Sequence, residues 1–466
     1  MKQVVVLTLL SFFLFWSCSS SKPAQESEAE EVIPKPGWVT SRPMRKDFYI
    51  GIAVVNKNHF PGTYAEEARK LALQDMASEI DVDIESTSML FTFENNQGGF
   101  RDEYRSYARM TTNKQLRRFE LEDIYETDEK YWVYYSLSKA VYQKDKNERM
   151  EKALSNSKQF VTEAQELKKK SRYRDAFVQY MRALRAVEEF AGEPLRTEYN
   201  GSEVFWGNAL PAEINGFAAS LQFDNAGSQR EVLWGLAPQN EAVTAVLRDV
   251  NGNTVAGIPV RITYSEGFIR PRISLTNVRG EVTANLTKIR EKKEQQKLTF
   301  TVDLLEMFNA AEGEPADNFM EELIERISAP RKERSLHVQA PRIMVQCTAQ
   351  LPRGVIADQS PEQAAVERLN KLGFRVVTNE STADLVFDVR VSAKLLEPMA
   401  DMHRCDITVN LVVKELRRGE TLYNETLPNI RGVQLSDAAA AQNGIYKTAD
   451  ELNEVAVPRF YRSLLK

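Results

Sequence analysis

An apolar run from Val4 to Trp16, interrupted only by Thr8 and Ser11, follows Lys2 at the start of the chain. At about 1.5 Å per residue, this run is too short to cross a hydrocarbon core of about 30 Å, which needs about 20 residues. A positive start followed by a short apolar core is typical of a secretory signal peptide. We therefore predict that residues 1–17 are a signal peptide and that the remaining chain folds outside the cytoplasm.

Cys18 follows this leader directly, after the small residue Ser17. The stretch Leu14-Phe15-Trp16-Ser17-Cys18 resembles a bacterial lipobox, in which the cysteine becomes the acylated first residue of the mature chain. Phe15 occupies the usual leucine position, and Leu14 lies one residue earlier. The resemblance implies a palmitate-type anchor on Cys18 that contacts membrane lipid, and no other cofactor. The alternative is an ordinary cleaved signal peptide with an incidental cysteine.

Residues 18–36 are rich in Ser, Glu, Pro and Ala. Such a segment carries too little apolar surface to order itself, so it predicts a disordered tether between the anchor and the first folded domain. Serines rather than aspartate follow Cys18, which by resemblance to sorted lipoproteins favours the bacterial outer membrane. We expect the protein to be lipid-anchored there, facing the periplasm or exposed at the cell surface.

The length of 466 residues is enough for three or four domains of about 100–200 residues each. Apolar residues make up 42% and charged residues 27%, an ordinary globular composition that excludes a polytopic membrane protein. The 61 basic and 66 acidic side chains give a net charge of -5, so no positive excess favours nucleic acid as a partner. Changes in hydrophobic period along the chain predict a multidomain α+β fold.

Residues 37–146 predict a small α+β domain. A buried strand at 48–53 comes first, and a hairpin of 116–126 with 131–137 comes last. Between them, apolar residues three and four apart predict a helix, namely Ala65, Ala68, Ala72, Met76 and Ile80. Alternation then predicts a further strand through Val82, Ile84 and Ser86.

The order of short motifs over residues 36–142 resembles the LPP-twenty lipoprotein domain of bacterial envelopes. The motifs are Pro-x-Trp, then Tyr-Ile-Gly-Ile-Ala, an alanine-rich helix, and the closing strand Tyr131-Trp132-Val133-Tyr134-Tyr135. The resemblance implies a small α+β domain on a lipid anchor, without established catalytic residues.

Residues 147–192 predict a helical hairpin. The spacing of Tyr173, Ala176, Tyr180 and Ala183 resembles the second half of a tetratricopeptide repeat, with Ala164 on the preceding helix. A single repeat cannot bury its own face, so a helical spacer packed on its neighbours is favoured over a peptide-binding groove. Glycine and proline breaks in residues 193–239 predict an irregular connector.

Residues 240–304 predict alternating strands separated by Gly- and Asn-containing turns, and they resemble bacterial immunoglobulin-like β-sandwich modules. Residues 305–335 predict a helical linker. Residues 336–466 predict an α/β domain with a mixed sheet. Its pattern of helix, strands, hairpin and alanine-rich helix resembles domains of the curli secretion-channel lipoprotein and the amino terminus of the Tol-system translocation protein B.

Few residues in the sequence could support catalysis or metal binding. Cys347 and Cys405, with His403, could form an open three-ligand zinc site. Strand parity instead directs both cysteines to the apolar face, so we expect buried free thiols, with a disulfide as the other alternative. His59 lies in a predicted loop, where a solvated side chain is expected. Paired carboxylates are expected on exposed faces, namely Glu66-Glu67, Glu120/Glu122 and Glu321-Glu322.

These patterns predict a non-catalytic, membrane-anchored envelope lipoprotein that binds or positions other envelope proteins, as part of an outer-membrane or secretion complex. No catalytic or metal-binding residue is assigned. The alternative is a hydrolase of cell wall or glycans whose carboxylates are brought together by the fold. The sequence leaves the partner and the oligomeric state open.

Overall fold

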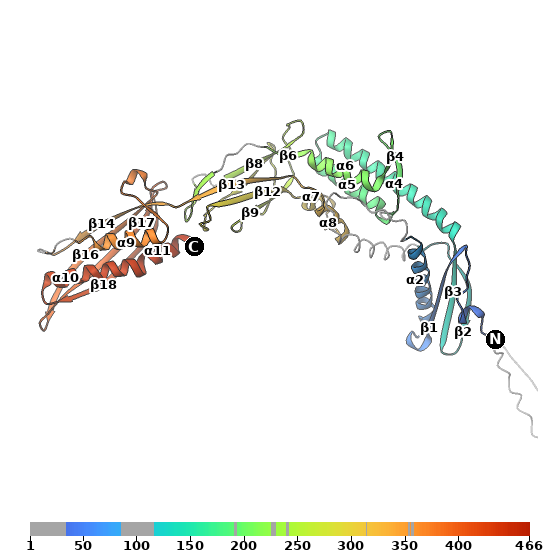
Figure 1. Ribbon diagram of the computed structural model, residues 1–466, viewed down its shortest axis with the longest axis horizontal. Helices are drawn as coiled ribbons and strands as arrows, with labels where there is room; N and C mark the ends of the chain where they lie inside the picture. The colour runs from blue at the N-terminus through green and yellow to red at the C-terminus, as the bar shows by residue number, and fades with distance from the viewer. Residues whose placement is uncertain are drawn as a thin grey trace, which may run out of the picture. The chain divides into compact units, whose positions relative to one another are not determined.

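The computed structural model describes residues 34–84, 116–190, 193–224, 230–238, 242–313, 315–352, 355 and 358–466. These residues belong to two compact units (Figure 1). The described part of unit 1 consists of residues 34–83 and 116–142, and that of unit 2 consists of residue 84 and the described residues from 143 to the C-terminus. Each unit contains helices and β-sheets, so the predicted multidomain α+β fold is confirmed.

Unit 1 consists of a long helix packed on a three-stranded antiparallel sheet with strand order β1-β3-β2. Its elements are α1 (Gly37–Thr40), β1 (Phe48–Asn56), η1 (Lys57–His59), α2 (Tyr64–Ile84), β2 (Glu120–Glu126) and β3 (Lys130–Ser138). The first strand, the helix and the closing hairpin are therefore confirmed.

Small residues along α2 allow this helix to lie close to the sheet. Ala68, Ala72 and Met76 are all fully buried. Opposite them, a Cβ atom at Gly51 of β1 would overlap the carbonyl oxygen of Ala72, so only glycine permits this approach. The alanine stripe and one glycine thus set the distance between helix and sheet.

The strand predicted from Val82, Ile84 and Ser86 is wrong over its described part. The helix α2 continues to Ile84, and Ser86 lies outside the described residues. An alternation of three residues is too short to distinguish the helical period of about 3.6 from the strand period of about 2. In the structure the helix continues through Val82 and Ile84. Ala65, expected on the buried stripe, is exposed, because burial of the helix begins one turn later at Ala68.

Unit 2 begins with helices. The described helices are α4 (Lys139–Lys169), which starts in unit 1, α5 (Tyr173–Val187), η2 (Glu188–Phe190) and α6 (Trp206–Ala219). The rings of Phe177 and Tyr180 on α5 lie 6.0 and 5.3 Å from that of Phe217 on α6, measured between centroids. The helices predicted within 147–192 are confirmed, and α6 supplies the cover that the hairpin cannot provide for itself.

The irregular connector predicted for residues 193–239 is wrong. Besides α6, this stretch contains β4 (Arg196–Tyr199), β5 (Ser202–Phe205), β6 (Leu221–Phe223) and β7 (Arg230–Leu233). Trp206 of α6 is fully buried, and its Nε1 donates a hydrogen bond to the Ser157 hydroxyl of α4 at 2.8 Å. Such short elements are stabilised by tertiary contacts rather than by a local pattern, which explains the error.

The middle of unit 2 contains two β-sheets, with strand orders β10-β9-β12-β13-β7 and β11-β8-β6. The strands not yet given are β8 (Ala242–Asp249), β9 (Pro259–Tyr264), β10 (Ile273–Leu275), β11 (Glu281–Asn285), β12 (Gln295–Val302) and β13 (Arg331–Gln339). Leu247 of one sheet and Phe300 of the other belong to the same hydrophobic core.

This two-sheet region exceeds the predicted range 240–304 at both ends. The strands β6 and β7 precede it, and β13 begins within residues 305–335, which were predicted to be a helical linker, and continues into the predicted C-terminal domain. Only α7 (Leu304–Glu312) and α8 (Asn318–Glu325) make that stretch helical. The strand β13 pairs with β12 along one edge and with β7 along the other. A local sequence pattern does not determine such long-range pairing.

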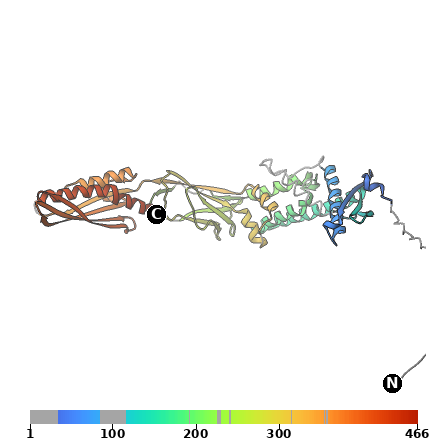
Figure 2. The ribbon, with the colours of Figure 1, turned by 90° about the horizontal axis from the view of Figure 1, so that it is seen from below.

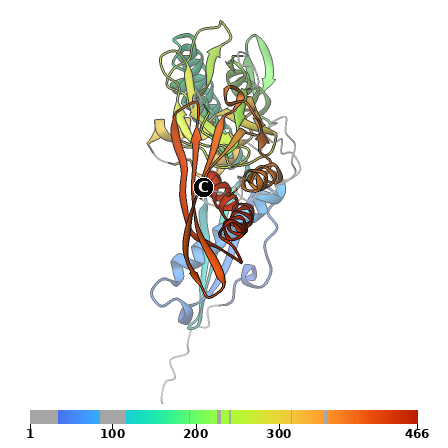
Figure 3. The ribbon, with the colours of Figure 1, turned by 90° about the vertical axis from the view of Figure 1, so that its left-hand side faces the viewer.

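The last part of unit 2 is a mixed sheet of order β15-β14-β16-β17-β18. The strand β14 runs parallel to β15 and β16, whereas β16, β17 and β18 are antiparallel. Helices α9, α10 and α11 lie together on one face of this sheet (Figures 2 and 3). The elements are β14 (Arg342–Gln350), α9 (Ser360–Lys371), β15 (Arg375–Val376), η3 (Glu380–Thr382), β16 (Leu385–Met399), β17 (Met402–Glu415), β18 (Glu420–Gln434), α10 (Asp437–Glu451), η4 (Leu452–Ala456) and α11 (Val457–Leu465). The mixed sheet and its order of elements are confirmed.

Aromatic rings connect the two-sheet region of unit 2 to its last sheet. Trp234, which follows β7, has its ring centroid 4.6 Å from that of Phe374, and Phe374 lies 5.8 Å from Phe460 of α11. The Lys292 ammonium lies 4.2 Å from the Trp234 ring centroid and donates to the carbonyl oxygen of Leu372 at 2.5 Å. The hydrophobic core of unit 2 is therefore continuous from its helices to its last sheet.

Candidate functional site

Cys18, the predicted lipidation site, lies outside the described residues. The exposed imidazole of His59 lies in η1, and all the paired carboxylates predicted on exposed faces are exposed or half-buried. The described residues contain no cluster of three side chains suited to a metal ion. No helix within them has the length and apolarity to cross a membrane.

The structure separates Cys347 from Cys405. Cys347 on β14 is paired with Val389 of β16, whereas Cys405 on β17 is paired with Leu395 of β16. Val389 and Leu395 are six residues apart on one strand, a separation of about 20 Å. A disulfide requires Cα atoms within about 7 Å. The disulfide and the shared zinc site therefore do not fit the structure.

Both thiols are free, and both lie in apolar surroundings. Cys405 is fully buried, whereas Cys347 is only half-buried. Burial raises the pKa of Cys347 to about 11, with smaller contributions from the charges of Glu362 and Asp388, and burial also raises the pKa of Cys405. A protonated thiol is a poor nucleophile and metal ligand, so neither cysteine is prepared for such chemistry.

His403 has a partner other than a metal ion. Its Nδ1 lies 2.8 Å from a carboxylate oxygen of Asp437, in the first turn of α10. This contact ties β17 to α10. The imidazole therefore has a structural role rather than a place in the zinc site considered as an alternative.

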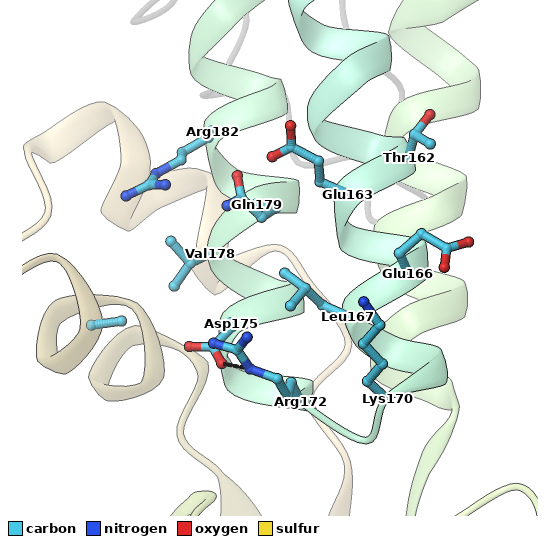
Figure 4. A pocket seen from close by; sticks show the side chains of 11 residues that line it. Thr162, Glu163, Glu166, Leu167, Lys170, Arg172, Asp175, Val178, Gln179 and Arg182 are labelled. Carbon is cyan, nitrogen blue, oxygen red and sulfur yellow. Dashed lines mark hydrogen bonds and ion pairs between the residues drawn. The ribbon is translucent and has the colours of Figure 1, made fainter.

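A groove lies between α4 and α5, beside α7, and its volume is about 510 Å³ (Figure 4). We call it the hairpin groove. Leu167 of α4, Val178 of α5 and Ala311 of α7 supply its apolar surface. The remaining lining residues are polar or charged, namely Thr162, Glu163, Glu166, Lys170, Arg172, Asp175, Gln179 and Arg182. An apolar strip bordered by charges of both signs suits a segment of another protein.

Polar groups in the hairpin groove differ in how well they are paired. At the end near the α4–α5 turn, Arg172 donates to Asp175 at 2.7 Å (Figure 4). Arg182 forms an ion pair with Glu312 of α7 at 2.9 Å. The side-chain oxygen of Gln179 is buried and accepts no hydrogen bond from any described residue.

A second cavity, of about 460 Å³, is formed by β7, the β13–β14 connection and the ends of β15, β16 and β17. We call it the arginine cavity. Its charged lining residues are Arg230, Glu231, Arg342, Arg375, Asp384, Glu415 and Arg417. These residues come from separate segments of the chain, so no local sequence motif predicts the cavity.

Asp384 is the best-paired carboxylate of this cavity. Its side chain is 1% exposed, and its oxygens accept hydrogen bonds from the Arg342 guanidinium at 3.0 and 3.1 Å and from Arg417 at 3.0 Å. The Arg342 backbone N–H donates to it as well, at 2.9 Å. Burial alone would raise the pKa of Asp384, but hydrogen bonds and charge from Arg342 outweigh burial and lower it.

Glu415 lies in the same cavity and behaves in the opposite way. Burial raises the pKa of this carboxyl above its ordinary value, and the charge of Arg418 compensates only in part. Two carboxyls with pKa values moved apart are also a feature of acid–base catalysts. Here, however, both oxygens of Asp384 are held by arginines, which leaves this carboxylate no free position for attack on a substrate.

No protein-family model matches the chain, and no curated protein sequence matches it. Parts of solved structures align with it. A lipoprotein from Neisseria meningitidis is 13% identical over 25% of this chain and 98% of its own, with a TM-score of 0.18. A minor lipoprotein from Acinetobacter baumannii is 14% identical over 27% and 92%, with a TM-score of 0.18. A hypothetical protein from Chlamydia trachomatis is 11% identical over 27% and 98%, with a TM-score of 0.20. At TM-scores this low, the alignments carry no argument about the fold of this chain.

Proposed function

We propose that this chain is a non-catalytic lipoprotein of the bacterial envelope that holds partner proteins close to the outer membrane. The observation that carries the proposal is the leader that ends at Cys18, followed by the polar residues 18–36. Acylation of Cys18 would place the two units at a membrane surface, and the polar segment would set their reach. Tethering raises the effective concentration of a partner without a new contact.

The arrangement of unit 1 supports this proposal. One strand, a helix rich in small residues and a hairpin form the small α+β domain that the resemblance to LPP-twenty lipoproteins implies. The two-sheet region of unit 2 has the architecture that an immunoglobulin-like spacer would need. The resemblance of the last sheet to curli and Tol-system domains motivates the narrower proposal, a role in assembling a secretion or envelope complex.

The hairpin groove is the contact surface that the geometry favours. Its apolar strip, bordered by charges of both signs, matches a protein segment whose apolar side chain is flanked by polar groups. The competing hydrolase has one supporting observation, the opposite pKa shifts of Asp384 and Glu415. Because arginines hold the Asp384 oxygens, this pair supports a hydrolase less well than the groove supports a binding protein.

One experiment in intact bacteria tests both parts of the proposal. A photo-crosslinking residue at Thr162, which is exposed in the hairpin groove, should capture a defined outer-membrane protein. The same residue at Lys152, exposed on α4 outside the groove lining, is the matched control and should not capture it. A labelled fatty acid should be incorporated into this protein, and the substitution Cys18→Ala should remove both the label and most of the adduct.

Two outcomes would contradict the proposal. A wild-type chain that incorporates no fatty acid would remove the anchor. Equal adducts from Thr162 and Lys152 would remove the groove as the specific surface and leave only the anchor.

A further inference from the structure

The arginine cavity contains positive charge that its own carboxylates do not neutralise. Asp384 is shared between Arg342 and Arg417, so one negative charge faces two guanidinium groups. The other two carboxyls of the lining, Glu231 and Glu415, form no ion pair with any described residue. Two further arginines, Arg230 and Arg375, line the same space.

The guanidinium of Arg230 has few acceptors among the described residues. It is half-buried, and its only hydrogen bond with a described residue is to the carbonyl oxygen of Ala242, at 2.9 Å. A guanidinium has five N–H donors, so most of its donors lack a protein acceptor. Burial lowers the pKa of Arg230, and no neighbouring carboxylate offsets this effect. A half-buried cation without a counter-charge loses part of its solvation, and an anion in the cavity would offset that loss.

Arg375 adds a second, accessible cation. It lies on β15, at the edge of the last sheet, where its backbone N–H donates to Pro341. Its side chain is exposed at the cavity and makes no ion pair with a described residue. Even with Glu231, Asp384 and Glu415 all ionised, the four arginines of the lining exceed its three carboxylates by one positive charge.

We propose that the arginine cavity binds a ligand with a carboxylate or phosphate group, held by Arg230 and Arg375. The planar fork of a guanidinium matches two oxygens of either group. The volume of about 460 Å³ is suitable for a small molecule or the end of a larger one. The Arg342–Asp384–Arg417 network, with its bidentate contacts, forms a rigid wall beside this site. This binding is separate from the protein partner proposed for the hairpin groove.

Titration calorimetry on the full chain in detergent micelles tests the site, with inorganic phosphate and succinate as separate probes. At least one probe should bind saturably, and Arg230→Gln and Arg375→Gln should each weaken it about tenfold or more. Binding of only one probe identifies the group that the cavity selects. Arg248→Gln is the matched control, because Arg248 is also half-buried and also donates to a backbone carbonyl, that of Gly252, at 3.0 Å. The Arg248→Gln variant should bind the same probe as tightly as the wild type does.

The proposal is overturned if neither probe binds saturably, or if Arg248→Gln weakens binding as much as Arg230→Gln does. A thermal melt of each variant separates a lost site from a lost fold. Because Arg375 is exposed, its variant should melt like the wild type, so weaker binding in Arg375→Gln cannot be attributed to unfolding.

Discussion

At the scale of single residues, the clearest feature of this protein is one buried carboxylate shared by two arginines. Asp384 directly precedes β16, and it receives donors from β14 and from the turn after β17. The pairing therefore fixes three segments that are distant in the sequence. The two guanidiniums remain 39% and 45% exposed, so part of each charge stays solvated when the carboxylate is removed.

The substitution Asp384→Asn should therefore lower the free energy of unfolding at pH 7 by about 2–3 kcal/mol, less than the loss of a fully buried pair. Since the pKa of Asp384 is lowered in the folded state, its stabilising effect is complete above the ordinary pKa of an aspartate. The effect disappears as the pH falls through the lowered value. Urea unfolding at pH 7 and at about pH 3 should show the difference between variant and wild type shrinking with acid.

Asp388→Asn is the control for this prediction. Asp388 lies on β16, four residues after Asp384, and pairs with Arg390, which is 65% exposed, so its loss should cost under about 1 kcal/mol. Equal costs for the two variants would show that the Asp384 network contributes no more than a surface pair.

At the scale of elements, glycines decide how closely helices approach sheets. A Cβ at Gly432 of β18 would overlap the carbonyl oxygen of Ala440 and lie 2.5 Å from the backbone nitrogen of Gly444, both on α10. A Cβ at Gly444 would in turn lie 2.7 Å from Cδ1 of Ile407 on β17. The overlap at Gly432 is with backbone atoms of α10, so no side-chain rotation can relieve it.

Gly432→Ala should therefore destabilise unit 2 by about 1–3 kcal/mol, the usual cost of overpacking. Gly216→Ala is the opposite case, because Gly216 lies inside α6 with open space around its Cα. Its gain in helix propensity should stabilise the same unit by about 0.5–1 kcal/mol. Denaturant midpoints of both variants check this prediction, and a neutral effect of Gly432→Ala would contradict the close packing of α10 on β18.

At the scale of the whole molecule, the described residues of each unit form a hydrophobic core of their own. Val55, Ala68, Ala72 and Val133 form a cluster within unit 1, whereas one continuous core extends through unit 2. Separate cores favour separate cooperative transitions.

Differential scanning calorimetry of the full chain should therefore resolve two transitions. Gly51→Ala, which forces β1 away from α2, should lower the melting temperature of one transition by several degrees and leave the other within about one degree. A single transition that Gly51→Ala shifts as a whole would contradict the independence of the two units.

Most elements of this protein are predictable from sequence because their hydrophobic period is local. The spacing of Ala68, Ala72 and Met76 indicates α2, and the alternation around Ile407, Val409 and Leu411 indicates β17. Each pattern fits within one element, so neighbouring residues alone carry it. The interpretation of residues 1–17 as a leader and of Cys18 as a lipidation site also depends on a contiguous segment, and both stay predictions.

Only the tertiary structure decided how these elements combine. Strand partners far away in the sequence decide the pairing of β13 with β7 and β12 and the distance between Cys347 and Cys405. The helix α6 within residues 193–239 likewise depends on its packing against distant helices. The arginine cavity is the clearest case, because Arg230 and Arg375 are unremarkable surface types in the sequence. They acquire a common role only because separate strands bring both to one space, and a local pattern contains no information about such long-range pairing.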